Sequence, residues 1–314
     1  MRRSWVIALA ALVPAAAAPT DPGPAPFTAT TTRGRDRTAS RLVLLGSGTP
    51  NADPDRSGPA LAVIVNGAAY LVDAGPGVVR RAAAAERRGI AALSVKNLRI
   101  VFLTHLHTDH TVGLPDLIFT PWVLEREAPL QVYGPPGVKA MTEHLSAAYE
   151  QDMRIRLEGL EPANATGYRV VAHEITPGVV YRDSNVTVTA FAVPHGSWPY
   201  AFGYRFDTRD RRIVISGDTR ATDAIVEQCG GCDVLVHEVY AQAGWERLPP
   251  EWQRYHASFH TSAVDLGRLA ARAGPKRLVL YHQLPWRSTP EQIVREIRAH
   301  FAGPVAYGSD LDVY

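Results

Sequence analysis

Four side chains that bind metal well fall within six positions, and this cluster limits what the chain can be more than any other feature. Residues 104–113 read Thr-His-Leu-His-Thr-Asp-His-Thr-Val-Gly and follow a largely apolar run over 98–103. Imidazole and carboxylate groups are ligands that Zn²⁺ prefers and that Fe and Mn accept. A solvated, histidine-rich loop is the alternative. A dense cluster directly after a strand-like run favours a metal centre instead, with His105, His107, Asp109 and His110 as candidate ligands.

The N-terminus predicts an export signal. Met-Arg-Arg is followed by an apolar stretch over residues 5–18, and small alanine residues precede Pro19. A basic start, an apolar stretch short for a bilayer and small residues at its end are typical of a secretory signal peptide, which is removed. We therefore expect residues 1–18 to be a signal peptide, and the mature protein to be periplasmic or secreted without a stable membrane anchor.

Residues 19–40 predict a disordered linker. They contain Pro19, Pro22, Pro24 and Pro26, followed by a run rich in Thr and Arg. Such a composition has too little apolar area to offset the entropy lost on ordering. We expect one folded domain over residues 41–314, a length that is ordinary for a single layered α/β fold.

The charge balance does not favour a dedicated polyanion binder. The whole chain carries a formal charge of +2, and loss of Arg2 and Arg3 with the signal leaves 31 basic and 31 acidic residues. Binding to a long nucleic acid usually rests on an excess of Lys and Arg.

The two cysteines, Cys229 and Cys232, occur as Cys-Gly-Gly-Cys. In an exported protein this spacing suits a tight disulfide, and a lone pair does not complete a structural zinc site. A structural disulfide and an idle pair of thiols both remain open, and both are favoured over redox chemistry.

The pattern of apolar residues predicts an α/β fold. Strand-like segments lie at residues 42–45, 61–65, 69–72, 100–103, 130–133, 168–172, 186–193, 200–206, 213–216, 234–237, 277–281 and 305–307. Helical patterns lie at residues 78–88, 138–150, 222–229, 262–273 and 290–301. Strand hairpins come first, helices are added and the series repeats. This order predicts two sheets packed face to face with helices outside, a four-layer αββα sandwich in a single domain.

Polar residues fall just after several of these strand-like segments. If the strand ends share one edge of the sandwich, their side chains converge on one cleft, where loops commonly carry function. The residues concerned are Asp73, His105, His195, Asp218, Glu238 and His282.

These motifs, in this order, resemble the metallo-β-lactamase superfamily. The resemblance covers nearly all of residues 41–314 and rests on Thr104-His105-Leu106-His107-Thr108-Asp109-His110, Leu71-Val72-Asp73-Ala74-Gly75, Pro194-His195, Ser216-Gly217-Asp218-Thr219 and Tyr281-His282. Within the superfamily the chain most resembles the branch of the tRNA 3′-end-processing endonuclease RNase Z, which also holds cyclic-nucleotide phosphodiesterases and some arylsulfatases. The features that carry this are Gly46-Ser47-Gly48-Thr49-Pro50, His237-Glu238 and His260-Thr261-Ser262-Ala263.

The resemblance implies two metal ions, Zn²⁺ by expectation and Mn²⁺ or Fe²⁺ as alternatives. It implies that a hydroxide held between them attacks the phosphorus or sulfur of an ester. The implied ligands are His105, His107 and His195 for the first ion, Asp109, His110 and His282 for the second, and Asp218 for both.

The expected catalytic residues are Asp109, His260 and Glu238. His260 would assist the leaving group, and Glu238 would fix the tautomer of His260 and raise its pKa. Asp73 is expected to orient the metal-binding loop, as outer carboxylates do. His237 is expected to form structural hydrogen bonds because it neighbours Glu238 on a strand and faces the other way.

One departure from RNase Z bears on the substrate. Only residues 196–217 separate His195 from Asp218, where the processing endonuclease typically inserts a long arm that grips tRNA. We therefore expect an exported hydrolase of a small anionic ester, first a phosphodiester such as a cyclic nucleotide, with no tRNA partner. An arylsulfatase, a lactonase or β-lactamase, and a non-catalytic metal-binding module are the alternatives. A homodimer is expected only by analogy with the branch.

Overall fold

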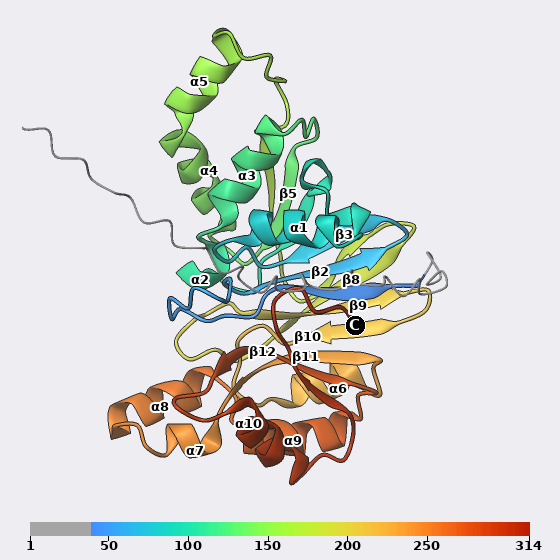
Figure 1. Cartoon of the computed structure of the whole chain (residues 1–314), viewed down its shortest axis with the longest axis vertical. Coiled ribbons are helices and arrows are strands. Elements are labelled where there is room, and N and C mark those ends of the chain that lie inside the picture. Colours follow the sequence, from blue (N-terminus) through green and yellow to red (C-terminus); the bar gives the residue numbers. More distant parts are fainter. Residues whose placement is uncertain (1–38) are drawn as a thin grey trace, which may run out of the picture. The chain divides into compact units, whose positions relative to one another are not determined.

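The computed structural model describes residues 39–314, which form one α/β unit in four layers (Figure 1). Two sheets lie face to face, and helices cover the outer face of each. The expected αββα sandwich in a single domain is confirmed. The predicted signal peptide and almost all of the predicted linker lie outside the described residues. Ser40 is already buried and donates its backbone N–H to Asp210 Oδ2 over 2.9 Å, so the ordered part starts before Arg41.

The first sheet has six strands in sequence order. Its first three strands pair antiparallel and the later ones pair parallel. The central strands are buried on both faces because helices cover one face and the second sheet covers the other. The strands are β1 (Arg41–Gly46), β2 (Ala60–Val65), β3 (Ala68–Val72), β4 (Ile100–Phe102), β5 (Leu130–Gly134) and β6 (Val170–Glu174).

The second sheet has seven strands in the order β13-β12-β11-β10-β9-β8-β7. The pairs from β13 to β10 are parallel, and those from β10 to β7 are antiparallel. β7 was not among the predicted strands. The strands are β7 (Gly178–Arg182), β8 (Val186–Ala192), β9 (Phe202–Thr208), β10 (Arg212–Ile215), β11 (Val234–Tyr240), β12 (Leu278–Leu284) and β13 (Val305–Tyr307).

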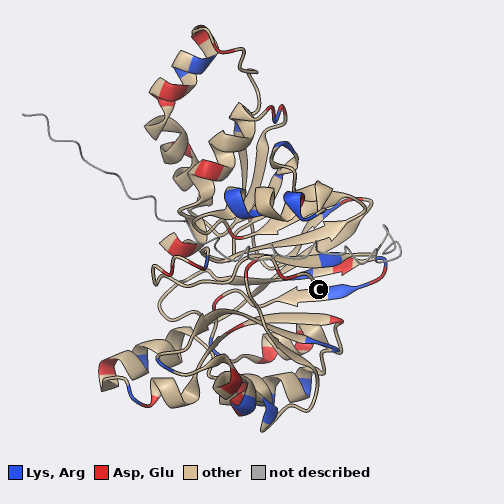
Figure 2. Cartoon of the chain, viewed as in Figure 1, with Lys and Arg blue, Asp and Glu red and all other residues tan. Residues whose placement is uncertain are grey.

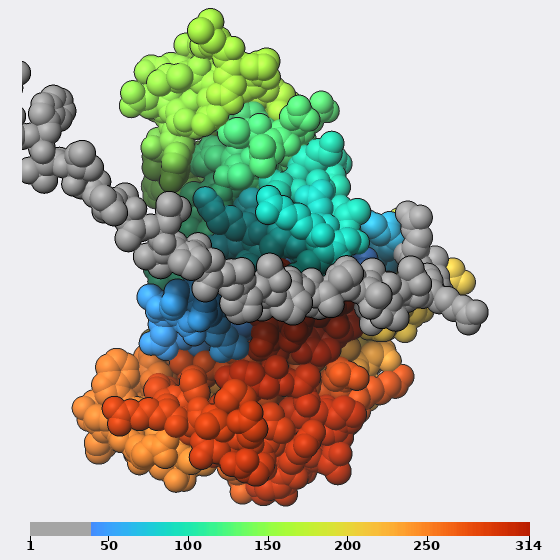
Figure 3. Space-filling view, viewed as in Figure 1, coloured from blue at the N-terminus to red at the C-terminus, as the bar shows by residue number. Residues whose placement is uncertain are grey.

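Helices form the two outer layers. α1, α3 and α4 lie over the first sheet, and α6, α9 and α10 lie over the second (Figure 1). α5 follows α4 and stands out from the body as a lobe in light green (Figure 3), and it buries none of its side chains. The helices are α1 (Val78–Arg87), α2 (Thr108–Thr111), α3 (Leu114–Val123), α4 (Val138–Ala148), α5 (Glu150–Glu158), α6 (Asp223–Cys229), α7 (Gln242–Trp245), α8 (Pro250–Phe259), α9 (Ala263–Ala273) and α10 (Pro290–Arg298), with 3₁₀ turns at Ala91–Leu93 and Val95–Asn97.

Three apolar cores hold the layers together. Leu71 faces α1 and α3 in one core, while its neighbour Val72 faces the second sheet in the next, as the two-residue period of a strand requires. Phe102 lies between the sheets and makes an edge contact with Phe206, with ring centroids 5.7 Å apart. The third core joins the second sheet to α6, α9 and α10. Each fully buried side chain of this size contributes about 2 kcal/mol, so the two sheets are firmly fixed relative to each other.

The cysteine pair forms a disulfide at the end of α6. Cys229 is the last residue of the helix, and Cys232 lies three positions later; both are buried. Gly230 and Gly231 between them have positive φ angles of 45° and 79°, which glycine adopts without steric cost. Of the two states left open by the sequence, the structure has the disulfide.

Within residues 39–314 no helix is both long enough and apolar enough to cross a membrane.

Candidate metal centre

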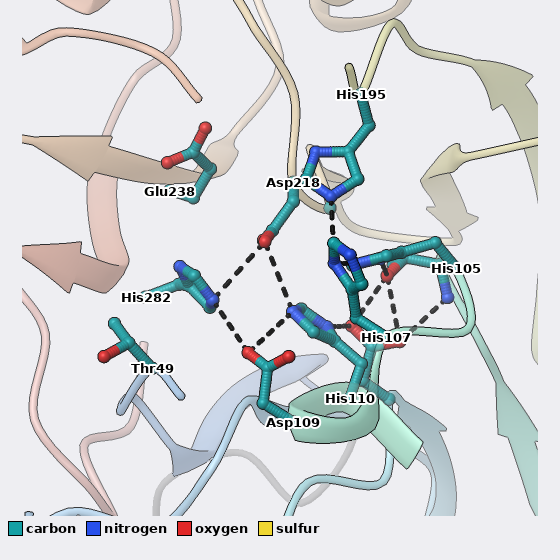
Figure 4. A network of polar contacts seen from close by, with 12 residues as sticks. Thr49, His105, His107, Asp109, His110, His195, Asp218, Glu238 and His282 are labelled. Carbon is teal, nitrogen blue, oxygen red and sulfur yellow. Dashed lines mark hydrogen bonds and ion pairs between the residues drawn. The ribbon is translucent and has the colours of Figure 1, made fainter. Parts of the chain in front are cut away.

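The predicted site residues come together at one edge of the sandwich, where loops leave both sheets (Figure 4). Asp73 directly follows β3, and His105 follows β4 by three positions. His195 and Asp218 each follow a strand of the second sheet, β8 and β10, by three positions. The expectation that strand ends deliver these side chains to one place is met by all four.

The prediction that Glu238 and His282 come just after strands is wrong. Both lie inside strands, β11 and β12. Glu238 pairs with Tyr281 and Val239 pairs with Gln283, so His282 is the extra residue of a β-bulge. Its φ of 45° is left-handed. The bulge turns the imidazole of His282 toward the other ligands, and bulges often aim side chains at functional sites in this way.

The loop that carries the histidine cluster packs tightly on the segment after β3. The backbone N–H of Ala74 donates to the carbonyl of His110 over 2.8 Å, and Gly113 donates to the carbonyl of Ala74 over 2.9 Å. A Cβ on Gly75 would lie 2.7 Å from the carbonyl oxygen of Asp109, closer than real contacts. The backbone of Gly58 and Pro59 is closer still, so the Asp-Ala-Gly motif ends in glycine because two backbone segments, one of them the metal-binding loop, lie against it.

Three histidines form the first group of candidate ligands. Nδ1 of His107 lies 2.9 Å from Nε2 of His105 and 3.1 Å from Nε2 of His195. One ion could contact all three nitrogens at this spacing. This trio is the one expected from the sequence for the first ion.

Asp109, His110 and His282 form the second group. Oδ2 of Asp109 lies 3.2 Å from Nε2 of His282 and 3.5 Å from Nε2 of His110. Oδ2 of Asp218 lies 3.4 Å from the same nitrogen of each histidine. Asp218 also groups with His105, so its carboxylate faces both trios (Figure 4).

The electrostatics of this cluster match a divalent cation. Asp73, Asp109 and Asp218 are buried, and among residues 39–314 no Lys or Arg lies within ion-pair distance of them. Burial opposes the charged form of His110, but Asp218 and the other two carboxylates outweigh it and raise its pKa well above the usual value. Nε2 of His110 and Oδ1 of Asp218 are buried without a hydrogen-bond partner. Buried donor atoms in a negative field fit a bound metal.

Hydrogen bonds behind three of the histidines hold their Nε2 atoms toward the cluster. Nδ1 of His110 meets Asp73 Oδ2 at 2.8 Å, and Nδ1 of His195 meets the carbonyl of Phe259 at 2.8 Å. Nδ1 of His105 lies 3.0 Å from the hydroxyl of Thr104. Such outer partners fix the ring and the tautomer of a ligating histidine. Asp73 thus lies where the sequence reasoning expected an orienting carboxylate.

His260 lies beside the second group, but its relation to Glu238 differs from the prediction. Nδ1 of His260 lies 3.5 Å from Oε2 of Glu238, too far for a good hydrogen bond. Burial lowers the pKa of His260 to about 4, and Glu238 does not raise it. Burial and the charge of Asp218 raise the pKa of Glu238 well above its usual value. The predicted increase in the pKa of His260 is therefore wrong.

Glu238 instead fastens the backbone on two sides of the site. Its Oε1 accepts the N–H of Thr261 over 2.8 Å and the N–H of Thr219 over 3.4 Å. Thr261 follows His260, and Thr219 follows Asp218. Glu238 thereby holds both loops in place without touching the centre of the cluster.

The remaining histidines take no part in the cluster. His237 is buried and its Nδ1 contacts the carbonyl of Glu238 at 2.7 Å, as expected of a structural residue. His256 packs on Trp286, with ring centroids 4.4 Å apart. Sequence reasoning missed one contact: the indole N–H of Trp198 donates to Nε2 of His107 over 2.6 Å. The only signal for it was an aromatic residue three positions after His195.

A pocket of about 550 Å³ opens beside Asp109. Pro50, Ala52, Pro54 and Val112 give it apolar walls, and Thr49, which also lines it, lies near Asp109 and His282 (Figure 4). Its volume is in the range of small-molecule sites.

Comparison with known proteins agrees with this geometry. A family model described as a beta-lactamase superfamily domain matches residues 69–283. Ribonuclease Z of Mycobacterium bovis (strain BCG / Pasteur 1173P2) is 32% identical over 275 residues, which cover 86% of this chain and 96% of that protein.

Solved structures show the same fold. Human tRNase Z, short form, is 22% identical, with a TM-score of 0.66 over 87% of this chain and 98% of that chain. A diphosphatase from the PhnP family is 19% identical, with a TM-score of 0.59 over 88% of this chain and 97% of that chain. The chain therefore belongs to the metallo-β-lactamase superfamily, in its RNase Z-like branch of metal-dependent hydrolases.

Proposed function

We propose that this protein is an exported hydrolase with two Zn²⁺ ions that cleaves a small phosphodiester. The observation that carries the proposal is the pair of ligand groups that face each other across Asp218. A structural zinc site needs four closed ligands, whereas two open groups that share a carboxylate are typical of hydrolytic centres.

The donor set assigns residues to the two ions. His105, His107 and His195 would hold the first, Asp109, His110 and His282 the second, and Asp218 would contact both. Nitrogen and carboxylate donors suit Zn²⁺ and also allow Mn²⁺ or Fe²⁺. When bound, such ions make hydroxide available at neutral pH and take up negative charge on the oxygens of the ester.

His260 supports the leaving group in this proposal. Its ring is almost completely buried and stacks near His282, with ring centroids 5.7 Å apart, so it faces the second group. Glu238 acts through the backbone, because it ties Thr261 beside His260 to Thr219 beside Asp218. We assign to His260, whose imidazole is neutral at pH 7, the donation of its N–H to the departing oxygen, and to Glu238 a positioning role.

Several features support a small substrate rather than tRNA. Residues between His195 and Asp218 form a plain hairpin, β9 and β10, where an RNA-gripping arm would be inserted. Lys and Arg are scattered among Asp and Glu over both helical layers (Figure 2). The pocket beside Asp109 has largely apolar walls, which suit a compact organic group better than a phosphate chain. The relatives named as a ribonuclease and a diphosphatase support phosphate chemistry and give no support to the sulfatase alternative.

Export is supported by the disulfide. Cysteine pairs stay oxidised in the periplasm and outside the cell, and are kept reduced in most cytosols. Together with the signal-like N-terminal sequence, this favours a periplasmic or secreted enzyme.

A substrate panel tests the proposal. Purified protein loaded with zinc or manganese is offered bis-p-nitrophenyl phosphate, a cyclic nucleotide, p-nitrophenyl sulfate and a precursor tRNA. We expect turnover of the diesters and none of the tRNA. Sulfate turnover above diester turnover, or efficient tRNA cleavage, contradicts the proposed substrate.

The metal assignment is tested by elemental analysis. The Asp218→Ala variant should hold less metal than the unaltered protein, because it removes the carboxylate common to both groups. Full occupancy in that variant contradicts the shared role.

A further inference from the structure

The two ring nitrogens of His107 have the opposite roles to those of His105, His110 and His195. His105, His110 and His195 have Nδ1 engaged behind them and Nε2 turned inward. In His107 Nδ1 faces the other ligands, and Nε2 accepts the indole N–H of Trp198 over 2.6 Å. An indole nitrogen is a donor only, so Nε2 of His107 carries no proton while this hydrogen bond exists.

This hydrogen bond and metal binding require opposite tautomers of His107. A neutral imidazole has one proton, so a bare Nε2 puts that proton on Nδ1, the atom that faces His105 and His195. A metal ion needs a bare Nδ1, which moves the proton to Nε2. Two N–H groups would then face each other at a separation of 2.6 Å, which is repulsive.

We propose that Trp198 is a metal-responsive side chain: its N–H holds His107 in the tautomer that cannot bind metal through Nδ1, and its indole leaves that position when the first ion binds. The number of protons on His107 is the same before and after; only the nitrogen that carries the proton changes. The inference rests on the metal centre proposed above.

The surroundings of Trp198 allow the indole to move without the backbone. Its own backbone N–H donates to the carbonyl of His195 over 3.0 Å, which fixes the chain beside another ligand. The side chain is only half-buried, and its ring stands edge-on to His107, with centroids 4.9 Å apart. A rotation of the indole would therefore break its contact with His107 while the backbone beside His195 stays in place.

Indole-¹⁵N-labelled, metal-free protein titrated with zinc tests the proposal. The N–H signal of Trp198 should shift as the first equivalent of zinc binds, since its hydrogen bond to His107 is lost. Trp198→Phe identifies that signal and removes the opposing hydrogen bond. We expect this variant to bind zinc about fivefold more tightly in competition with a chelator, because a hydrogen bond of this kind contributes about 1 kcal/mol.

Trp245→Phe is the matched control. Trp245 is also half-buried and donates its indole N–H over 2.9 Å, but to the carbonyl of Gln253 rather than to a ligand. Its zinc affinity should equal that of the unaltered protein.

Two results would overturn the inference and leave the metal centre standing. One is a Trp198 signal that does not shift when zinc binds. The other is a zinc affinity of Trp198→Phe that is equal to, or weaker than, that of Trp245→Phe. Should the Phe variant fold poorly, the signal is identified with Trp198→Tyr and the titration of the unaltered protein decides. A protein that binds no zinc at all refutes both this inference and the proposed function.

Discussion

Asp73 and His110 are joined by a 2.8 Å hydrogen bond between Oδ2 and Nδ1, and both side chains are buried. The other carboxylate oxygen of Asp73 accepts the backbone N–H of Thr104 over 2.8 Å. One side chain at the end of β3 thus holds both the start and the end of the segment that carries the histidine cluster.

Replacing Asp73 by Asn should weaken metal binding. Asn has nearly the same size but lacks the negative charge that holds Nδ1–H of His110. Loss of such an outer partner typically costs 10- to 100-fold in metal affinity. Competition with a chromogenic zinc chelator measures the change. Asp152→Asn, which alters a half-buried pair with Arg156 on α5, far from the ligands in the chain, is the control and should bind zinc normally. Equal affinities in the two variants would show that Asp73 does not orient the ligand.

Replacing His260 by Ala should slow the enzyme in a way that depends on the leaving group. Proton donation matters most for poor leaving groups, so kcat should fall by about 10²- to 10⁴-fold for an alkyl ester and little for p-nitrophenolate. His256 is four positions earlier, with its ring centroid 5.7 Å from that of His260, and makes His256→Ala a close control. Equal losses with both kinds of ester would remove the role of His260 as a proton donor.

His237 should make the metal-free protein less stable in acid. Burial lowers its pKa from 6.5 to about 4. As the pH falls from 6.5 to 4, the unfolded chain takes up a proton that the folded chain refuses, so the free energy of unfolding decreases. This pKa shift corresponds to a decrease of about 3 kcal/mol in the free energy of unfolding.

Urea unfolding of EDTA-treated protein at pH 7.5 and pH 4.5 measures this effect. His237→Leu should reduce the difference between the two pH values, while His144→Leu, exposed on α4, should not. An identical difference in all three proteins would rule out His237 as a source of acid sensitivity.

The sequence allowed the ligands to be found because their signal is local. The spacing from His105 to His110 and the apolar runs before Asp73, His195 and Asp218 need only the chain itself. The placement of Glu238 and His282 inside strands could not be predicted, because the bulge at His282 depends on how β12 pairs with β11.

The other features that were not predicted from the sequence depend on residues that are neighbours in space but not in the chain. β7 was missed because it is a short edge strand with largely exposed side chains. α8 was missed because none of its side chains is fully buried, which leaves a weak apolar pattern. The contact between Trp198 and His107 joins residues 91 positions apart and has no signature in the spacing of either.

Reducing the disulfide should destabilise the protein without emptying the metal centre. Cys229 and Cys232 close a very short loop, for which the chain-entropy model gives about 2 kcal/mol. Cys229 packs in the core between the second sheet and α9. The loss of stability therefore affects that helical layer and not the metal ligands. Urea unfolding of the Cys229→Ser/Cys232→Ser variant should show the lower free energy, and elemental analysis should show unchanged metal. Alkylation of cells under denaturing conditions also reports the compartment, because it exposes both buried cysteines at once. Both should resist labelling if the protein is exported with its disulfide, and labelling of both would argue against the disulfide and against export.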